Sequence, residues 1–331
     1  MSRKSAVVVC PGRGTYNASE LGYLKTYHAD KANLLARFDD QRRSRAQTPI
    51  AALDAADRFS LSKHTRGDNA SGLIYACSYA DFLEIERQSI DVVAVTGNSM
   101  GWYTALACAV AVSAENGFQI VNTMGTLMQE AMIGGQMLYP FVDEDWQEVP
   151  GKKAALVSLR ETIPDLYISI LLGGMIVFAG TVDALKAAEA RLEPAGRFPM
   201  RLANHAAFHT PLQAPVAEKG RALLDAALFD QPRIPLVDGR GHVWMPKASK
   251  PAALRDYTLG AQVTETYDFT RAITNALKEF APDILIILGP GSTLAGATAQ
   301  CLTQLGWQGI TDKGMFEQSR QAPDVCEAVE A

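Results

Sequence analysis

Four short runs of apolar, largely β-branched residues constrain the fold most strongly. They occupy residues 6–10, 92–96, 234–237 and 284–288, and each is bounded by turn-forming residues. Continuous apolar runs of this length are typical of strands covered on both faces, as in a parallel sheet. Helical patterns lie between the runs, for example at 78–86, 103–112 and 269–280. The alternation predicts an α/β fold wound around a parallel sheet.

The middle of the chain follows a different pattern. GQMLYPFV and residues 168–178 are strand-like, and residues 182–192 have a helical pattern. A chain of 331 residues exceeds one average domain, so it has room for a second unit. We therefore expect a large α/β domain made of residues 1–135 and 205–331, and a small α+β subdomain at residues 136–204.

Composition argues against several classes of partner. The net charge of −5 lacks the basic balance of nucleic-acid-binding proteins. The longest near-apolar segment, at 166–180, is shorter than a membrane span and contains Gly173 and Gly174. The apolar run near the N-terminus is too short for a signal peptide. We expect a cytoplasmic protein with neither nucleic acid nor membrane as partner.

The cysteines indicate thiols in a reducing compartment. All five are scattered along the sequence and none forms a CxxC pair, which argues against disulfides and against a structural zinc site. They are Cys10, Cys77, Cys108, Cys301 and Cys326.

The segment GNSMG at 97–101 places Ser99 between a predicted strand and a predicted helix. A sharp strand-to-helix turn exposes a serine hydroxyl, and flanking glycines let the backbone bend closely. The following helix would point backbone N–H groups at a developing oxyanion. The pattern predicts a nucleophilic serine, with an ordinary strand-to-helix turn as the alternative.

Such a serine needs a base, and the chain has five histidines: His28, His64, His205, His209 and His242. HAAFH at 205–209 has the spacing of a metal-binding pair, but it lacks the glutamate of HExxH and has no evident third ligand. CPGRG at 10–14 and LGPGSTLAG at 288–296 complete neither GxGxxG nor a P-loop. Because both follow predicted strands, we expect them to line a cleft.

Six segments together resemble the malonyl-CoA:acyl carrier protein transacylase family, which includes the acyltransferase domains of fatty acid and polyketide synthases. They are CPGRG, GNSMG, GTLMQEAM at 125–132, AAFHTPL at 206–212, QVTET at 262–266 and LGPGSTLAG. The resemblance implies an α/β-hydrolase-like large domain with a ferredoxin-like small subdomain. It also implies a ping-pong reaction from acyl-CoA to the phosphopantetheine arm of an acyl carrier protein, with no tightly bound cofactor and no metal.

The resemblance also implies residue roles. Ser99 and His209 would be the catalytic pair, and a backbone carbonyl near Gln262 would orient the histidine. The backbone amides of Arg13 and Met100 would form the oxyanion hole. The acyl pocket would be formed by Met124, Leu171, Met175 and Phe208.

Two departures from the family bear on the acyl group. The family's arginine that binds the malonyl carboxylate falls on Met124, and a polar segment of the family is replaced by the apolar ISILLGGM at 168–175. A carboxylate buried there without a cation would be costly. We therefore expect a non-carboxylated acyl group. Arg13, which replaces a glutamine of the family, is an alternative source of positive charge, and Asn98 replaces a histidine.

Three other functions stay open at this point. An acyl hydrolase would release acyl groups from carrier protein to water, and a non-catalytic homologue would only bind the carrier. A conventional α/β-hydrolase needs an acid between the serine and the histidine in chain order. Its candidates all fall in the expected subdomain and are Asp143, Asp145, Asp165 and Asp183.

Overall fold

The computed structural model describes residues 3–319 and contains two five-stranded sheets. The first sheet has the strand order β10-β1-β2-β7-β8. Its strands are β1 (Lys4–Cys10), β2 (Ile90–Gly97), β7 (Leu236–Val237), β8 (Val243–Trp244) and β10 (Ile284–Ile287). β1 lies parallel to both β2 and β10, β2 lies parallel to β7, and β8 closes the edge antiparallel to β7. The predicted α/β class with a parallel sheet is confirmed.

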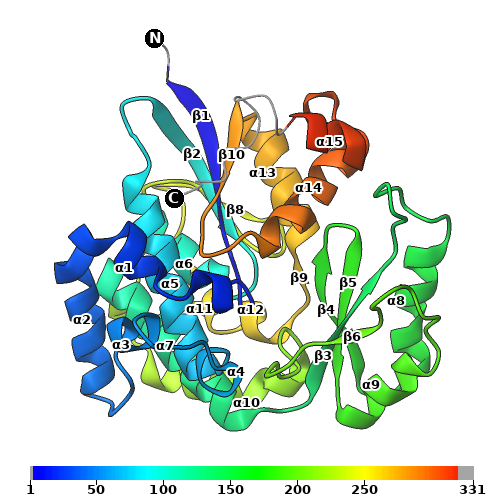
Figure 1. The fold of residues 1–331 in the computed structure, drawn as a ribbon, viewed down its shortest axis with the longest axis horizontal. Coiled ribbons are helices and arrows are strands. Elements are labelled where there is room, and N and C mark those ends of the chain that lie inside the picture. Colours follow the sequence, from blue (N-terminus) through cyan, green and yellow to red (C-terminus); the bar gives the residue numbers. More distant parts are fainter. Residues whose placement is uncertain (1–2, 320–331) are drawn as a thin grey trace.

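Helices surround this sheet on both faces (Figure 1). They are α1 (Tyr23–Tyr27), α2 (Ala32–Arg43), α3 (Ile50–Asp54), α4 (Leu61–His64), α5 (Gly67–Glu84), α6 (Gly101–Cys108), α7 (Ala114–Ala131), α10 (Ala214–Leu223), α11 (Pro251–Thr258), α12 (Ala261–Thr264), α13 (Phe269–Phe280), α14 (Thr293–Leu305) and α15 (Lys313–Ser319). Short 3₁₀ helices occupy Ala18–Glu20, Ala29–Lys31, Pro211–Gln213, Ala226–Leu228 and Trp307–Gly309.

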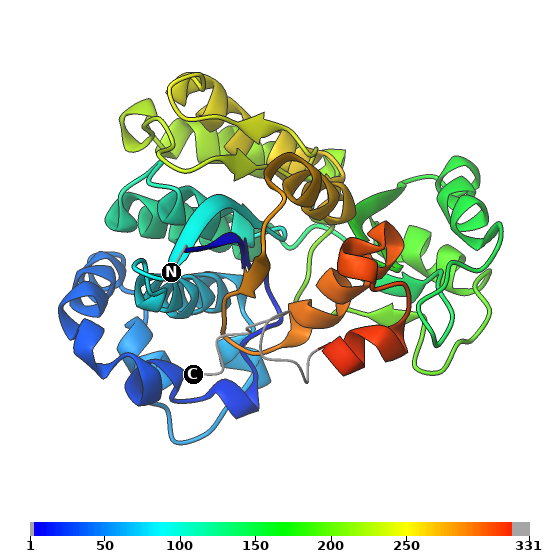
Figure 2. The same cartoon turned by 90° about the horizontal axis from the view of Figure 1, so that it is seen from above.

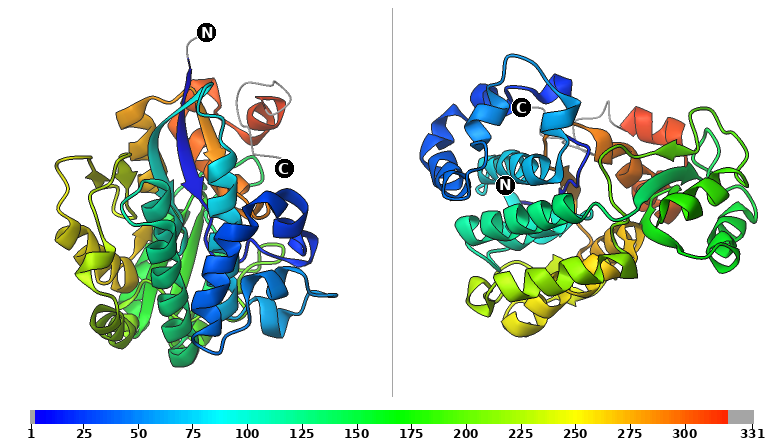
Figure 3. Two further views of the ribbon diagram at one scale, coloured as in Figure 1. Left: turned by 90° about the vertical axis from the view of Figure 1, so that its left-hand side faces the viewer. Right: turned by 90° about the horizontal axis from the view of Figure 1, so that it is seen from below.

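The longest helices, α5 and α7, pack along each other beside the sheet (Figure 3). α5 is buried on nearly all sides, which explains why it lacks the one-sided apolar pattern of a surface helix. Beneath them, the rings of Phe38 and Phe118 stack with centroids 4.5 Å apart, and Tyr75 meets both rings edge-on. This aromatic cluster joins α2, α5 and α7 into one core.

The second sheet has the order β6-β3-β5-β4-β9 and lies beside the first (Figure 2). Its strands are β3 (Gly135–Pro140), β4 (Leu166–Leu172), β5 (Met175–Gly180), β6 (Met200–Arg201) and β9 (Tyr267–Asp268). β3, β4, β5 and β6 pair antiparallel, whereas β9 pairs parallel with β4. Helices α8 (Lys152–Thr162) and α9 (Val182–Glu189) close over a separate apolar core around Met137, Phe178 and Leu185.

Several elements differ from their predicted extents. The strand-like run 168–178 is a hairpin, because Gly173 and Gly174 turn the chain between β4 and β5. The run 234–237 contributes only Leu236–Val237 as strand β7, and the backbone oxygen of Pro235 before it accepts from the Val95 amide over 2.9 Å. The helix predicted at 182–192 ends at Glu189. The second sheet takes β9 from outside residues 136–204.

Four of the cysteines, Cys10, Cys77, Cys108 and Cys301, are buried free thiols, and Cys326 lies outside the described residues. No helix within residues 3–319 has the length and hydropathy needed to cross a bilayer.

The aromatic cluster gives a stability prediction. Phe118 is fully buried, so Phe118→Ala removes its stacking on Phe38 and leaves a cavity. We expect the free energy of unfolding to fall by about 3–5 kcal/mol, measured by urea denaturation followed by circular dichroism. Val182→Ala, at an exposed position on α9, is the control and should change it by less than about 0.5 kcal/mol. A loss below about 1 kcal/mol for Phe118→Ala would contradict this packing.

Candidate active site

Ser99 lies in the tight turn between β2 and α6, with a left-handed φ of 55°. This conformation is unfavourable for a residue with a side chain and is a form of strain often found at functional sites. The turn is packed against β1, because a Cβ atom at Gly101 would lie 2.2 Å from the carbonyl oxygen of Cys10. A Cβ atom at Gly97 would similarly lie 2.5 Å from the Gly101 backbone. The glycines on either side of Ser99 are therefore required by close backbone contact.

Ser99 and His209 form a hydrogen-bonded pair. The distance from Ser99 Oγ to His209 Nε2 is 2.7 Å, although 110 residues separate them in sequence. His209 Nδ1 lies 2.6 Å from the backbone oxygen of Gln262. Because a carbonyl oxygen only accepts, Nδ1 must carry the proton, which leaves the Nε2 lone pair facing the serine hydroxyl. The pair thus has the arrangement of a nucleophile and its base.

Gln262 at α12 also supports the serine turn with its side chain. Its Nε2 donates to the backbone oxygen of Ser99 over 3.0 Å, and its Oε1 accepts from the hydroxyl of Tyr103 over 3.1 Å. One residue therefore positions both members of the pair, the histidine through its carbonyl and the serine through its amide.

Burial keeps His209 neutral. The ring is almost inaccessible, and this loss of hydration lowers the pKa of His209 to about 4, against a smaller opposing effect from the Gln262 carbonyl. A neutral imidazole at pH 7 can accept the serine proton.

The amides of Arg13 and Met100 are free to donate. Within residues 3–319, neither backbone N–H has a protein acceptor. Met100 precedes α6, so its N–H lies at a helix N-terminus that favours negative charge. Both residues line cavities that include Ser99.

The Arg13 side chain is held inside the protein. Its Nη2 donates to the backbone oxygens of Thr65 and Asn204, each over 2.8 Å, and the guanidinium lies over the Phe208 ring. Burial lowers the pKa of Arg13 to about 10, although the charge of Asp68 opposes the shift. The group stays positively charged at pH 7.

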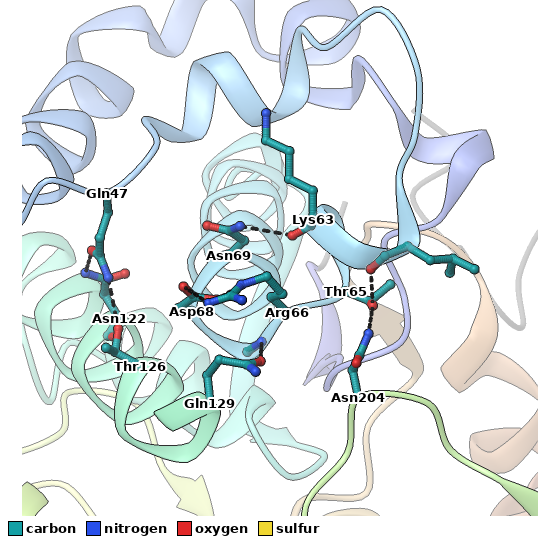
Figure 4. A network of polar contacts seen from close by, with 12 residues as sticks. Gln47, Lys63, Thr65, Arg66, Asp68, Asn69, Asn122, Thr126, Gln129 and Asn204 are labelled. Atoms are coloured by element: carbon teal, nitrogen blue, oxygen red, sulfur yellow. Dashed lines mark hydrogen bonds and ion pairs between the residues drawn. The ribbon is translucent and has the colours of Figure 1, made fainter. Parts of the chain in front are cut away.

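Polar contacts hold the segment around Thr65, to whose backbone oxygen Arg13 donates. Asn204 donates to the Thr65 hydroxyl over 2.6 Å, and Gln129 on α7 accepts from the Gly67 amide over 2.7 Å (Figure 4). Arg66 pairs with Asp68 beside them. The start of α5 is thus bound to α7 on one side and to the loop before His209 on the other.

A cavity of about 320 Å³ opens beside Ser99 between the two sheets. Its lining is mainly apolar and comes from the second sheet, the loop after β1, the loop before His209 and α14. The apolar side chains are Leu138, Ile170, Leu172, Met175, Val177, Met200, Leu202, Phe208, Leu294 and Ala297.

The structure places two of the four predicted pocket residues at this cavity, Met175 and Phe208. Leu171 is not part of the lining, because a bulge between Ile168 and Ile170 shifts the alternation of β4 and turns Ile170 and Leu172 toward the cavity. Met124 is also not part of it: the side chain is fully buried, and its sulfur packs against Gly220 of α10.

The other histidines have separate environments. His205 lines the cavity and bonds to Gln136, so it shares no partner with His209. His28 pairs with Asp81, and His64 contacts the backbone of Leu53 and Ser60. Among the described residues, no group of three or more histidine, cysteine or acidic side chains is arranged for a metal ion.

The sequence analysis did not name Gln136 or His205 as parts of the acyl pocket, whereas it did name Arg13 as a source of positive charge there. A signal existed for Gln136, since it is a polar residue in an otherwise apolar predicted strand. The loop conformation that brings His205 to the cavity leaves no such pattern.

No family model matches this chain. The malonyl CoA-acyl carrier protein transacylase of Haemophilus influenzae is 25% identical over 227 residues, which cover 67% of this chain and 69% of that protein. A Mycobacterium marinum polyketide synthase, Pks15/1, is 23% identical over 308 residues, covering 89% of this chain but only 13% of the synthase.

Solved structures agree with these matches. The malonyl-CoA:acyl carrier protein transacylase from Xanthomonas oryzae superposes with a TM-score of 0.74 at 22% identity, covering 91% of this chain and 92% of that one. A malonyl-transacylase solved in complex with a type II polyketide synthase acyl carrier protein gives 0.73 at 20% identity, covering 90% and 93%. The predicted fold of an α/β-hydrolase-like domain with a ferredoxin-like subdomain is confirmed, and the chain is similar in sequence and in fold to malonyl-CoA:acyl carrier protein transacylases.

Proposed function

We propose that this chain is an acyltransferase that moves an acyl group from coenzyme A to an acyl carrier protein through an acyl-serine intermediate. The observation that carries the proposal is the 2.7 Å contact between Ser99 Oγ and a buried, neutral His209 at the edge of an apolar cavity. The relatives named as transacylases support the same class of reaction, and the solved complex of a similar protein with its carrier supports the acceptor.

The first half-reaction acylates the serine. His209 Nε2 takes the hydroxyl proton while Ser99 Oγ attacks the thioester carbonyl. The amides of Arg13 and Met100 stabilise the oxyanion, and each such donor typically lowers the barrier by about 2.7–4 kcal/mol. The tetrahedral intermediate then collapses, the C–S bond breaks, and His209 returns the proton to the coenzyme A thiolate.

The second half-reaction reverses these steps with the carrier's phosphopantetheine thiol. His209 removes the thiol proton and the sulfur attacks the acyl-serine carbonyl; the C–O bond to Ser99 then breaks, and His209 returns the proton to Ser99 Oγ. The Gln262 carbonyl stabilises the imidazolium in place of the carboxylate of a Ser-His-Asp triad.

The acyl group in this proposal carries no terminal carboxylate. The cavity lining is mainly apolar, so an ionised carboxylate would lose hydration without gaining a dedicated partner. Within residues 3–319, the cavity wall includes two cations, Arg13 and the exposed Arg197. The Arg13 side chain is buried, and its Nη2 already donates to two carbonyl oxygens. An aliphatic acyl chain fits this lining better than malonyl.

The acyl-serine gives the first activity prediction. Incubation with hexanoyl-CoA should add one acyl group to the intact protein, and Ser99→Ala should abolish the adduct. His209→Gln should slow its formation by about 10²–10⁴-fold. His242→Gln, at an exposed histidine, is the control and should leave the rate unchanged. No adduct in the wild type, measured by intact mass, would contradict the proposed chemistry.

The low pKa of His209 predicts the pH dependence. The neutral imidazole is the active form, so acylation is lost only as the pH falls through the folded pKa of about 4. The single-turnover rate should stay level from about pH 8 to about pH 5 and halve near pH 4. A half-maximal rate near the ordinary histidine value of about 6.5 would show that His209 is hydrated, contrary to the structure.

The choice of acyl group is tested with a thioester panel. Hexanoyl-CoA should acylate Ser99 about a hundredfold faster than malonyl-CoA, because burying an unpaired carboxylate costs several kcal/mol. Transfer is measured with and without carrier protein, and free acid is quantified to detect hydrolase activity. Faster acylation by malonyl-CoA that is lost in Arg13→Met would show that Arg13 pairs with a carboxylate. That result would contradict the proposed preference for a non-carboxylated acyl group.

A further inference from the structure

His205 lines the same cavity as Ser99, but it has no role in the proposed proton transfers. It lies on the loop between β6 and His209, and its ring packs near that of Phe208 with centroids 5.7 Å apart. Placing a polar imidazole in a mainly apolar cavity costs free energy unless its nitrogens form hydrogen bonds. Its hydrogen bonds therefore indicate what this wall of the cavity can recognise.

A chain of hydrogen bonds behind His205 fixes its protonation. The Ser169 hydroxyl lies 2.8 Å from the backbone oxygen of Phe208, which only accepts, so the hydroxyl proton points there. The hydroxyl consequently accepts from Gln136 Nε2 over 2.6 Å. This orients the Gln136 amide with its Oε1 toward His205 Nδ1, 2.7 Å away. Nδ1 must therefore carry the proton of the neutral ring.

The other ring nitrogen is left with a lone pair. Within residues 3–319, His205 Nε2 has no protein hydrogen-bond partner. Burial and the nearby charge of Arg13 lower the pKa of His205 well below its usual value, so the lone pair is not protonated at pH 7. The cavity wall thus presents a hydrogen-bond acceptor at His205 beside the positive charge of Arg13.

We propose that His205 Nε2 accepts a hydrogen bond from a hydroxyl group on the acyl chain, which makes hydroxylated, non-carboxylated acyl thioesters the preferred substrates. This inference rests on the proposed acyltransferase function and narrows its substrate class. A hydroxyl can donate a hydrogen bond to His205 Nε2. A carboxylate oxygen would be repelled by the Nε2 lone pair, because both carry negative charge density. A plain alkyl chain would leave Nε2 without a hydrogen-bond partner.

The test compares acyl chains that differ only in the hydroxyl. Hexanoyl-CoA is set against hexanoyl-CoA hydroxylated on the third, fourth or fifth carbon, each enantiomer separately, and the single-turnover rate of Ser99 acylation is measured by intact mass. We expect one hydroxylated thioester to react about tenfold faster than hexanoyl-CoA or better. Equal rates for all of them would overturn the inference while leaving the acyltransferase proposal intact. No adduct from any thioester would overturn both.

The ratio of the acylation rate with hydroxylated hexanoyl-CoA to the rate with hexanoyl-CoA separates recognition of the hydroxyl from structural damage. His205→Phe keeps a ring but removes the acceptor, so the preference for the hydroxylated chain should fall to about onefold, whatever the absolute rates. The matched control is His242→Phe, which replaces an exposed histidine and should keep the wild-type ratio. A preference that persists in His205→Phe would contradict the assignment.

A second measurement needs no variant. In histidine labelled with nitrogen-15, two-bond nitrogen–proton spectra show which ring nitrogen carries the proton. We expect His205 to be protonated on Nδ1 from about pH 6 to about pH 8, and the Nε2 signal to shift when the preferred acyl group occupies Ser99. A proton on Nε2 in the free protein would overturn the inference.

Discussion

The hydrogen bond between Ser99 Oγ and His209 Nε2 is the interaction on which the functional account depends. Both residues adopt left-handed backbone conformations, with φ values of 55° and 57°. Such conformations persist only where the surroundings enforce them. Here they are enforced by the glycine contacts of the serine turn and by the double role of Gln262, which binds the histidine with its carbonyl and the serine with its amide.

The two sheets contribute different parts of the site. The first sheet positions two of the proposed catalytic groups, since Ser99 follows β2 and the Arg13 amide follows β1. The second sheet supplies many of the apolar side chains of the cavity wall, through alternate residues of β3, β4 and β5. In the proposed acyltransferase, the separation of Ser99 and His209 from the side chains of the second sheet would allow the acyl preference to change without disturbing the serine and its base. This arrangement is consistent with relatives whose named substrate is malonyl.

The fold class was predicted from the alternation of apolar runs and helical patterns, and the residues that lie together in the site were predicted from short sequence segments. The resemblance of GNSMG, AAFHTPL and QVTET to the transacylase family implied that Ser99, His209 and Gln262 are partners, whereas the residues alone left the base open among five histidines. Their roles in acyl transfer stay predictions until they are tested.

The acyl pocket was harder to predict, because its lining depends on which way each side chain points. Because of a bulge in β4, Ile170 and Leu172 line the cavity and Leu171 does not. Met124 on α7 packs against Gly220 of α10 and does not line the cavity. The acceptor on His205 depends on the orientation of Gln136 and Ser169, two residues from different strands. These outcomes follow from packing between distant segments, which no sequence pattern encodes.

The central claim is that one hydroxyl carries the acyl group between two thiols. The most direct measurement loads the protein with a labelled acyl group, removes free coenzyme A, adds carrier protein bearing its phosphopantetheine arm, and follows both proteins by mass. The account predicts that the adduct, mapped to the peptide containing Ser99, disappears at the rate at which acylated carrier forms. Carrier acylation that proceeds without any prior adduct on that peptide would contradict it.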